Sequence, residues 1–356
     1  MIALNLAVPS LLNFYWRSSD PVRWERFLRY IIRLHSETVG PFTRRPVTTA
    51  LLHQLYLRTH DAWIAFLALQ GTLLASAAFV LGITAAKEDG PEKAWLAPLL
   101  FFLSFTVLFS FVTPNDSFDE PAQYLFFFLA LFFLRQNLEL GFACALFLAC
   151  LARETTLLLL PGLWLLDRRD AGVVRRMPQF VLPILAWALF YFWKEAPGDP
   201  GRFLYWIKNF GGLKVGYESI LSFALALAPA AIYFGQRPSL QESAWARAFL
   251  IAVALNTPIV FFAAYARESR LLALPLLFLW PRLGSALRIL RFRMDKREAL
   301  ALSLGAIIAG ALIWCTYVPN YRHVLGYRIY ASLVPALLMF AALNFLRKAA
   351  PQNASV

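Results

Sequence analysis

The chain has 356 residues, of which 60% are apolar and 15% are charged, and its formal net charge is +13. A water-soluble domain cannot cover that apolar fraction without exposing aggregating patches, so the composition excludes an ordinary soluble protein. The positive charge does not indicate nucleic-acid binding, because the basic residues lie mostly at the ends of apolar stretches, where they report membrane orientation. The composition therefore predicts an all-α protein with a lipid bilayer as its solvent.

Apolar stretches that approach the length of a membrane span recur along the whole chain. A bilayer core of about 30 Å needs roughly 20 helical residues, and fewer where helices are broken or line a cavity. The sequence thus predicts a polytopic transmembrane helix bundle of about ten to twelve spans, formed as a single transmembrane domain over residues 1–356. Prolines inside several stretches, such as Pro161 and Pro335, favour a hollow bundle with internal polar surface. The expected spans are residues 1–16, 62–86, 94–113, 121–136, 138–151, 155–166, 178–193, 219–235, 248–265, 271–280, 299–317 and 329–345.

The segments between these spans form two alternating sets. One set is rich in arginine and lysine, and its segment 282–297 alone contains six of them. The positive-inside rule places this set in the cytoplasm and the alternate set outside it. Both termini then lie in the cytoplasm, and we expect a multi-pass protein of the bacterial cytoplasmic (inner) membrane.

The first extracytoplasmic segment, residues 17–61, is long and not apolar enough to cross a membrane. Residues 21–35 place Trp24, Phe27 and other bulky apolar side chains on one helical face, with four arginines largely on another. This pattern predicts an amphipathic helix that lies in the membrane interface. Pro46 suits the first position of a second short helix, which we expect over residues 47–60.

Four charged residues of this segment are candidates for function. Asp20 directly precedes Pro21, a pattern typical of a helix N-cap, although a capping carboxylate can also be functional. Glu37 lies in a polar break between the two helices, where simple solvation explains it. Arg44 and Arg45 are adjacent and precede the second helix.

An acidic loop, PNDSFDE, covers residues 114–120. Its carboxylates are Asp116, Asp119 and Glu120, three within five residues. Such a cluster can bind a divalent cation or orient a sugar hydroxyl. The alternative is acid at a helix N-terminus, favoured by the helix dipole, with Pro121 in the first turn. Both interpretations stand at this point.

Arginine–glutamate pairs occur at two places between apolar stretches. Arg153 is followed by Glu154, and Arg267 and Glu268 are followed closely by Arg270. Charges so close to spans are costly unless they are paired, wet or functional. They can snorkel or close a helical turn, and they can also bind phosphate, because the planar guanidinium offers two parallel hydrogen bonds.

Several motifs together resemble bacterial GT-C-type membrane glycosyltransferases. They are Asp20 after the first span, RRPVTTALLHQLYLRTHDAW from Arg44, the acidic loop, ARETTLLLLP from Ala152 and ARESRLLALPLLFLWP from Ala266. The resemblance implies transfer of a sugar from a polyprenyl-phosphate donor on the outer face. By position, Asp20 matches the catalytic carboxylate, and Arg267 or Arg270 matches the donor-phosphate contacts.

The residues themselves extend this list of candidates. Arg44, Arg45 and Arg153 are further candidate contacts for the donor phosphate, and we expect Asp20, Arg153, Arg267 and Arg270 to face one outer cavity. The expected partners are membrane lipids, a polyprenyl-phosphate-linked sugar and other proteins of a membrane complex. Two other functions stand beside the glycosyltransferase: a non-catalytic scaffold subunit of such a complex, and a lipid or solute transporter.

Overall fold

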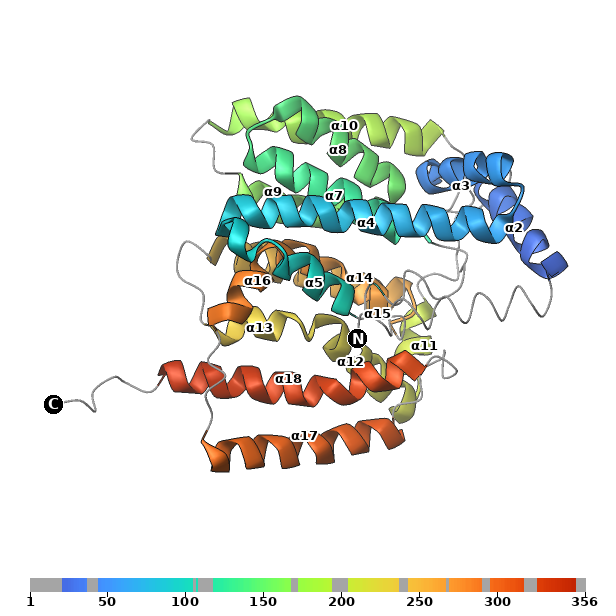
Figure 1. Cartoon of the computed structure of the whole chain (residues 1–356). Helices are drawn as coiled ribbons and strands as arrows, with labels where there is room; N and C mark the ends of the chain where they lie inside the picture. Colours follow the sequence, from blue (N-terminus) through green and yellow to red (C-terminus); the bar gives the residue numbers. More distant parts are fainter. Residues whose placement is uncertain are drawn as a thin grey trace. The chain divides into compact units, whose positions relative to one another are not determined.

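The computed structural model describes a chain whose elements, over the described residues, are all helices (Figure 1). It divides into two compact units, which are described separately. Unit 1 comprises Met1–Thr84 and Val107–Gly201, and unit 2 comprises Ala85–Thr106 and Arg202–Val356. The residues described are 21–36, 44–104, 107, 118–167, 172–193, 204–236, 243–266, 269–289, 295–316 and 325–349.

Unit 1 consists of helices, with α2 (Pro21–Ser36) and α3 (Pro46–Thr59) at one end (Figure 1). Within it α7 packs on α8, α8 packs on α10 and α3, and α3 packs on α2. The elements are α2 (Pro21–Ser36), α3 (Pro46–Thr59), α4 (Ala62–Asp89, which ends in unit 2), α7 (Glu120–Arg135), α8 (Glu139–Ala152), η3 (Glu154–Leu159), α9 (Leu160–Leu166) and α10 (Val173–Trp193).

Local sequence explains where the helices at this end start and stop. Pro46 occupies the first turn of α3, where no intrahelical N–H bond is lost, and His60 ends that helix in a left-handed conformation with φ 52°. Asp61 then caps α4, since its Oδ1 accepts hydrogen bonds from the backbone N–H groups of Trp63 (2.9 Å) and Ile64 (3.1 Å). The second expected surface helix, residues 47–60, is therefore present as α3.

The apolar face of α2 packs against protein. Ile31 is buried in a core cluster with Leu52 of α3 and Phe66 of α4, and Phe27 packs against the same cluster. The expected amphipathic helix thus exists, and at least part of its apolar face contacts α3 and α4.

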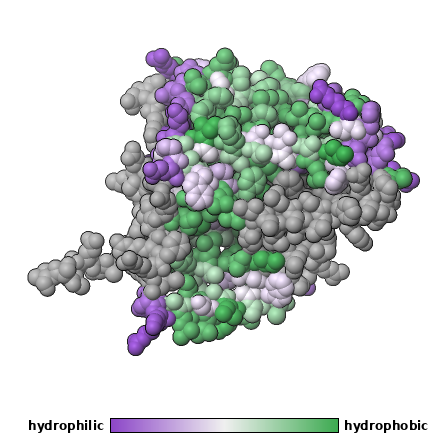
Figure 2. All heavy atoms as spheres, viewed as in Figure 1, coloured by the Kyte–Doolittle hydropathy of each residue, from purple (hydrophilic) through white to green (hydrophobic). Residues whose placement is uncertain are grey.

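Apart from those of α2, the described charged residues of unit 1 lie near the ends of its helices. Arg45 and Glu154 lie at the end that carries α2 and α3, whereas Arg135 and Asp167 lie where α7 and α9 finish. Hydrophobic residues cover the lengths between these ends (Figure 2). A bilayer requires this distribution, because its core does not solvate charge.

Unit 2 contains helices of very different length. Its pairs include α17 with α18, α16 with α5, and α14 with η5. The elements are η2 (Pro91–Lys93), α5 (Leu96–Leu103), α11 (Tyr205–Phe210), α12 (Leu213–Leu227), α13 (Ala230–Gly235), α14 (Ser243–Ala263), α15 (Ser269–Leu272), η5 (Leu274–Phe278), α16 (Trp280–Ile289), α17 (Lys296–Thr316) and α18 (Leu325–Ala349).

Four of the described helices, α4, α10, α14 and α17, are long and apolar enough to cross a membrane. Two expected spans take a different form. The stretch 219–235 is interrupted at Pro229, between α12 and α13, and the stretch 271–280 contains the short η5, whose residues are all buried. The expected first span, residues 1–16, lies outside the described part of the chain, and the single domain over the whole chain stays a prediction.

Candidate functional site

Five charged side chains meet at the α2 and α3 end of unit 1, and we call them the five-charge cluster. They are Arg45, Asp119, Glu120, Arg153 and Glu154. Four of the five are buried, and Asp119 has no exposed surface. Two guanidiniums and three carboxylates give a formal charge of −1 when all are ionised, since 2 − 3 = −1.

Three segments that are distant in sequence supply the cluster. Arg45 directly precedes α3, and Asp119 and Glu120 stand where α7 begins. Arg153 ends α8 in an extended conformation, with φ −160° and ψ 125°, and Glu154 opens η3. The break between α8 and η3 therefore places two successive charged residues at the end of an apolar helix.

Arg45 and Glu154 form a two-pronged ion pair. The Nε of Arg45 donates to Oε2 of Glu154 at 2.6 Å, and its second terminal nitrogen donates to Oε1. A third nitrogen of the same guanidinium lies 3.4 Å from Oδ2 of Asp119. Guanidinium and carboxylate match in this fork geometry, which gives the pair direction as well as strength.

Burial and the neighbouring carboxylates shift the pKa of Arg45 in opposite directions. Loss of water around the guanidinium opposes its charge, but the charge of Glu154 and its hydrogen bonds, followed by the charges of Asp119 and Glu120, raise the pKa of Arg45 above its usual value. Arg45 therefore keeps its positive charge at every pH the protein meets.

Arg153 pairs with Glu120, and neither side chain exposes more than 8% of its surface. One turn further along α7, the Nε2 of Gln123 donates to the hydroxyls of Thr155 (3.1 Å) and Thr156 (3.0 Å). The start of α7 is thus joined to the end of α8 and to η3 by an ion pair and two hydrogen bonds.

The acidic loop is also held from α4. The Nε2 of Gln70 donates to the carbonyl oxygen of Phe118 at 3.2 Å, and both side chains are buried. Phe118 stacks edge-on against Phe66, with 5.7 Å between ring centroids. The position of Asp119 is therefore fixed by its neighbour as well as by Arg45.

Arg44, the neighbour of Arg45, makes a different contact. Its guanidinium carbon lies 3.8 Å from the centroid of the Tyr191 ring, near the end of α10, and its side chain is half-buried. A guanidinium over an aromatic face is held by the ring quadrupole while its edges remain suited to hydrogen bonding.

The structure brings together some of the residues singled out from the sequence. Arg45, Asp119, Glu120 and Arg153 share the five-charge cluster, together with Glu154. Other predicted residues, or their side chains, lie outside the described residues, so the expected common cavity stays a prediction. These are Asp20, Glu37, Asp116, Arg267, Glu268 and the side chain of Arg270, which belongs to α15 of unit 2.

The sequence raises the possibility of a divalent cation at the acidic loop, and the structure describes only part of that loop. Of its three carboxylates, Asp119 and Glu120 are described, and both lie beside arginines. Over the described part of the chain, no group of three or more His, Cys, Asp or Glu residues is placed to hold a metal ion.

Unit 2 contains a polar residue that the sequence analysis missed. Asn209 of α11 is fully buried, and its Nδ2 donates to the carbonyl oxygens of Phe261 (2.9 Å) and Ala264 (2.8 Å). Its Oδ1 accepts from the backbone N–H of Ala266 at 3.0 Å. Asn209 thus fixes the chain where α14 ends, immediately before Arg267. A lone amide within the aromatic stretch YWIKNF is the signal that points to it.

No family model, curated protein or solved structure matches this chain. The residues and their geometry therefore carry the functional argument.

Proposed function

We propose that the chain is a multi-pass membrane glycosyltransferase of the GT-C type, which takes a sugar from a polyprenyl-phosphate donor. The observation that carries the proposal is the five-charge cluster. Burying charged groups is costly, and here four buried and one partly buried charged side chain join the first polar segment, the acidic loop and the α8–η3 break at one end of apolar helices.

The cluster supports a division of roles at this end of unit 1. Arg45 and Arg153 are engaged by carboxylates, so we assign them to anchoring the three segments. Arg44, whose guanidinium stacks on the Tyr191 ring, keeps the candidate phosphate role that the sequence gives it. In unit 2, Arg267 and Arg270 keep the phosphate role that the resemblance implies.

Asp20 is the proposed catalytic carboxylate. It directly precedes α2, whose residue Ile31 is fixed in the core of unit 1. A carboxylate there would take the proton of the acceptor hydroxyl as it attacks the sugar. Arginines would stabilise the lipid-phosphate leaving group, whose negative charge grows in the transition state. The arginine-rich segment 282–297 belongs to the set of loops that the positive-inside rule places in the cytoplasm. The segment that contains Asp20 belongs to the other set, so the proposed catalytic face is extracytoplasmic.

Transfer in proteoliposomes tests this function. The donors are radiolabelled polyprenyl-phosphate sugars, and a membrane extract supplies the acceptors. General base catalysis contributes about 10²–10⁴-fold, so Asp20→Asn should lower transfer by at least about 100-fold. Asp61→Asn is the matched control, because Asp61 belongs to the same segment and acts as a cap, a role that asparagine fills equally well. Equal transfer by Asp20→Asn and the wild type would remove Asp20 from the mechanism.

One observation favours a second candidate, a non-catalytic scaffold subunit. The arginines of the five-charge cluster are paired inside the protein, as in an ion network that only maintains structure. A scaffold predicts that Asp20→Asn leaves every transfer reaction unchanged, while Arg45→Ala releases partner subunits from the purified complex.

A further inference from the structure

Helix α2 presents a row of arginines on the side opposite its packed face. An α-helix turns about 100° per residue, so Arg26, Arg29 and Arg33 lie within about 60° of one another. Ile31, which is 1% exposed, lies about 140–160° from each of them. The three arginines are exposed. We call Arg26, Arg29 and Arg33 the arginine row.

The orientation of the arginine row is fixed by the packing of α2. Ile31 and Phe27 pack into the core cluster of unit 1, and Tyr56 of α3 donates a hydrogen bond from its hydroxyl to Glu25 at 2.9 Å. Rolling α2 about its axis would expose Ile31 and break this bond. The row therefore cannot turn inward, and its charges always face the surroundings of the protein.

Apolar and aromatic side chains are exposed beside the arginine row. Val22 and Tyr30 lie beside the arginines on the same side of α2, with 56% and 51% of their surface exposed. The neighbouring α3 exposes Leu51 and Leu57. Arginine mixed with tyrosine and aliphatic side chains is typical of a surface in the headgroup layer, where apolar stems and charged tips are solvated at different depths.

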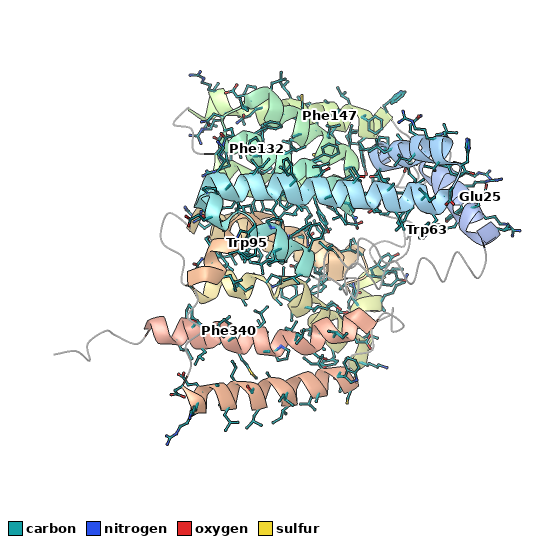
Figure 3. All side chains as sticks on the ribbon, in the orientation of Figure 1. Glu25, Trp63, Trp95, Phe132, Phe147 and Phe340 are labelled. Atoms are coloured by element: carbon teal, nitrogen blue, oxygen red, sulfur yellow. The ribbon has the colours of Figure 1, made fainter. Side chains whose placement is uncertain are left out.

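The position of α2 agrees with that layer. Glu25 of α2 and Trp63 near the start of α4 lie at one end of unit 1, whereas Phe132 of α7 lies toward the other (Figure 3). Since α4 is long and apolar enough to cross a membrane, its start marks the depth at which the chain leaves the lipid.

Glu25 of α2 does not cancel the charge of Arg29. Glu25 accepts a hydrogen bond from Arg29 at 2.7 Å, yet the Arg29 side chain keeps 72% of its surface exposed. Exposed ion pairs of this kind contribute little, so the guanidinium remains available to a second anion.

We propose that the arginine row is a binding surface for the headgroups of anionic phospholipids. Guanidinium groups bind phosphate oxygens by parallel hydrogen bonds, and each arginine near an anionic surface adds about fivefold to the binding constant. The surface is independent of sugar transfer and would serve an enzyme and a scaffold alike.

Lipid binding to the purified full chain tests the proposal. The delipidated protein is titrated in detergent with phosphatidylglycerol or phosphatidylcholine of identical acyl chains, and native mass spectrometry gives the dissociation constants. The wild type should prefer phosphatidylglycerol by tenfold or more. Arg26→Gln, Arg29→Gln and Arg33→Gln combined should reduce that preference at least tenfold, whereas lysine at the same positions should largely retain it.

A charge-matched variant controls for net charge. Arg58→Gln, Lys214→Gln and Lys296→Gln remove three exposed positive charges from other helices, and this variant should bind phosphatidylglycerol as the wild type does. An equal loss in both triple variants would show that net charge, and not the row, causes the preference. Equal binding of both lipids by the wild type, in the absence of any other protein, would assign the row to a protein partner or to water and overturn the proposal.

Discussion

Arg45 is separated from water because α3 holds it against the end of α8, where Glu154 meets its guanidinium. Such a pair contributes little to folding stability compared with apolar residues of the same shape, since both charged partners lose their hydration on burial. Breaking it is different, because one charge is then left buried without its partner. The two cases can be separated by experiment.

Arg45→Ala should lower the free energy of unfolding by about 3–5 kcal/mol, because Glu154 and Asp119 lose their guanidinium. The combined change Arg45→Met and Glu154→Gln should cost less than the sum of the two single changes, since it leaves fewer unpaired charges. Unfolding in mixed detergent–SDS micelles gives these free energies.

Arg58→Ala serves as the control, because Arg58 is exposed in the last turn of α3. Its loss should change the free energy of unfolding by no more than about 0.5 kcal/mol. Should Arg45→Ala prove as stable as Arg58→Ala, the five-charge cluster would not anchor this end of unit 1.

The sequence identifies most members of the cluster but not their pairing. Charges beside apolar stretches are costly, and this singles out Arg153 and Glu154, whereas Asp119 and Glu120 are singled out as carboxylates of the acidic loop. The partners depend on how helices pack: Arg45 and Glu154 are 109 positions apart, and Arg153 bonds Glu120 across 33 positions. Spacing along the chain carries no information about such pairs.

At the scale of elements, close helix crossings depend on particular glycines. A Cβ at Gly310 of α17 would lie 2.7 Å from the carbonyl oxygen of Ser332 in α18, so these helices could not keep their separation. A Cβ at Gly71 of α4 would meet nothing within 4 Å. The same substitution should therefore have opposite effects at the two positions.

Gly310→Ala should destabilise the protein by about 1–3 kcal/mol, the usual cost of overpacking. Gly71→Ala should stabilise it by about 0.5–1 kcal/mol, because alanine loses less backbone entropy in a helix. Thermal unfolding in detergent compares the two variants, and a stabilising Gly310→Ala would contradict the close packing of α17 on α18.

Apolar runs predict the long helices well and the broken ones poorly. The expected stretches 62–86 and 299–317 correspond to α4 and α17 within a few residues. The stretch 271–280 is equally apolar but contains the buried η5, packed on α14 and α16. Apolarity reports removal from water and does not distinguish lipid from protein as the new surroundings.

At the scale of the whole molecule, the two charged ends of unit 1 give a test of membrane orientation. Thr59 lies at the end of α3, and Leu138 lies in the turn between α7 and α8, at the opposite end; both are exposed. Single cysteines at these sites, in a background that lacks Cys144, Cys150 and Cys315, report which side each end occupies.

A membrane-impermeant maleimide should label Thr59→Cys in cells whose outer membrane has been opened. It should label Leu138→Cys only after the inner membrane is permeabilised, because the positive-inside rule places that end in the cytoplasm. Labelling of both cysteines from the same side would exclude a crossing of the membrane by unit 1.

The ion pair between Arg45 and Glu154 also sets an order of events during biosynthesis. Because 109 positions separate the partners, a ribosome that adds about 5–20 residues per second leaves Arg45 without Glu154 for roughly 5–20 s. A guanidinium cannot be buried cheaply before its carboxylate arrives. We therefore expect α3 to pack against the end of α8 only after Glu154 has been made, so that this end of unit 1 closes late.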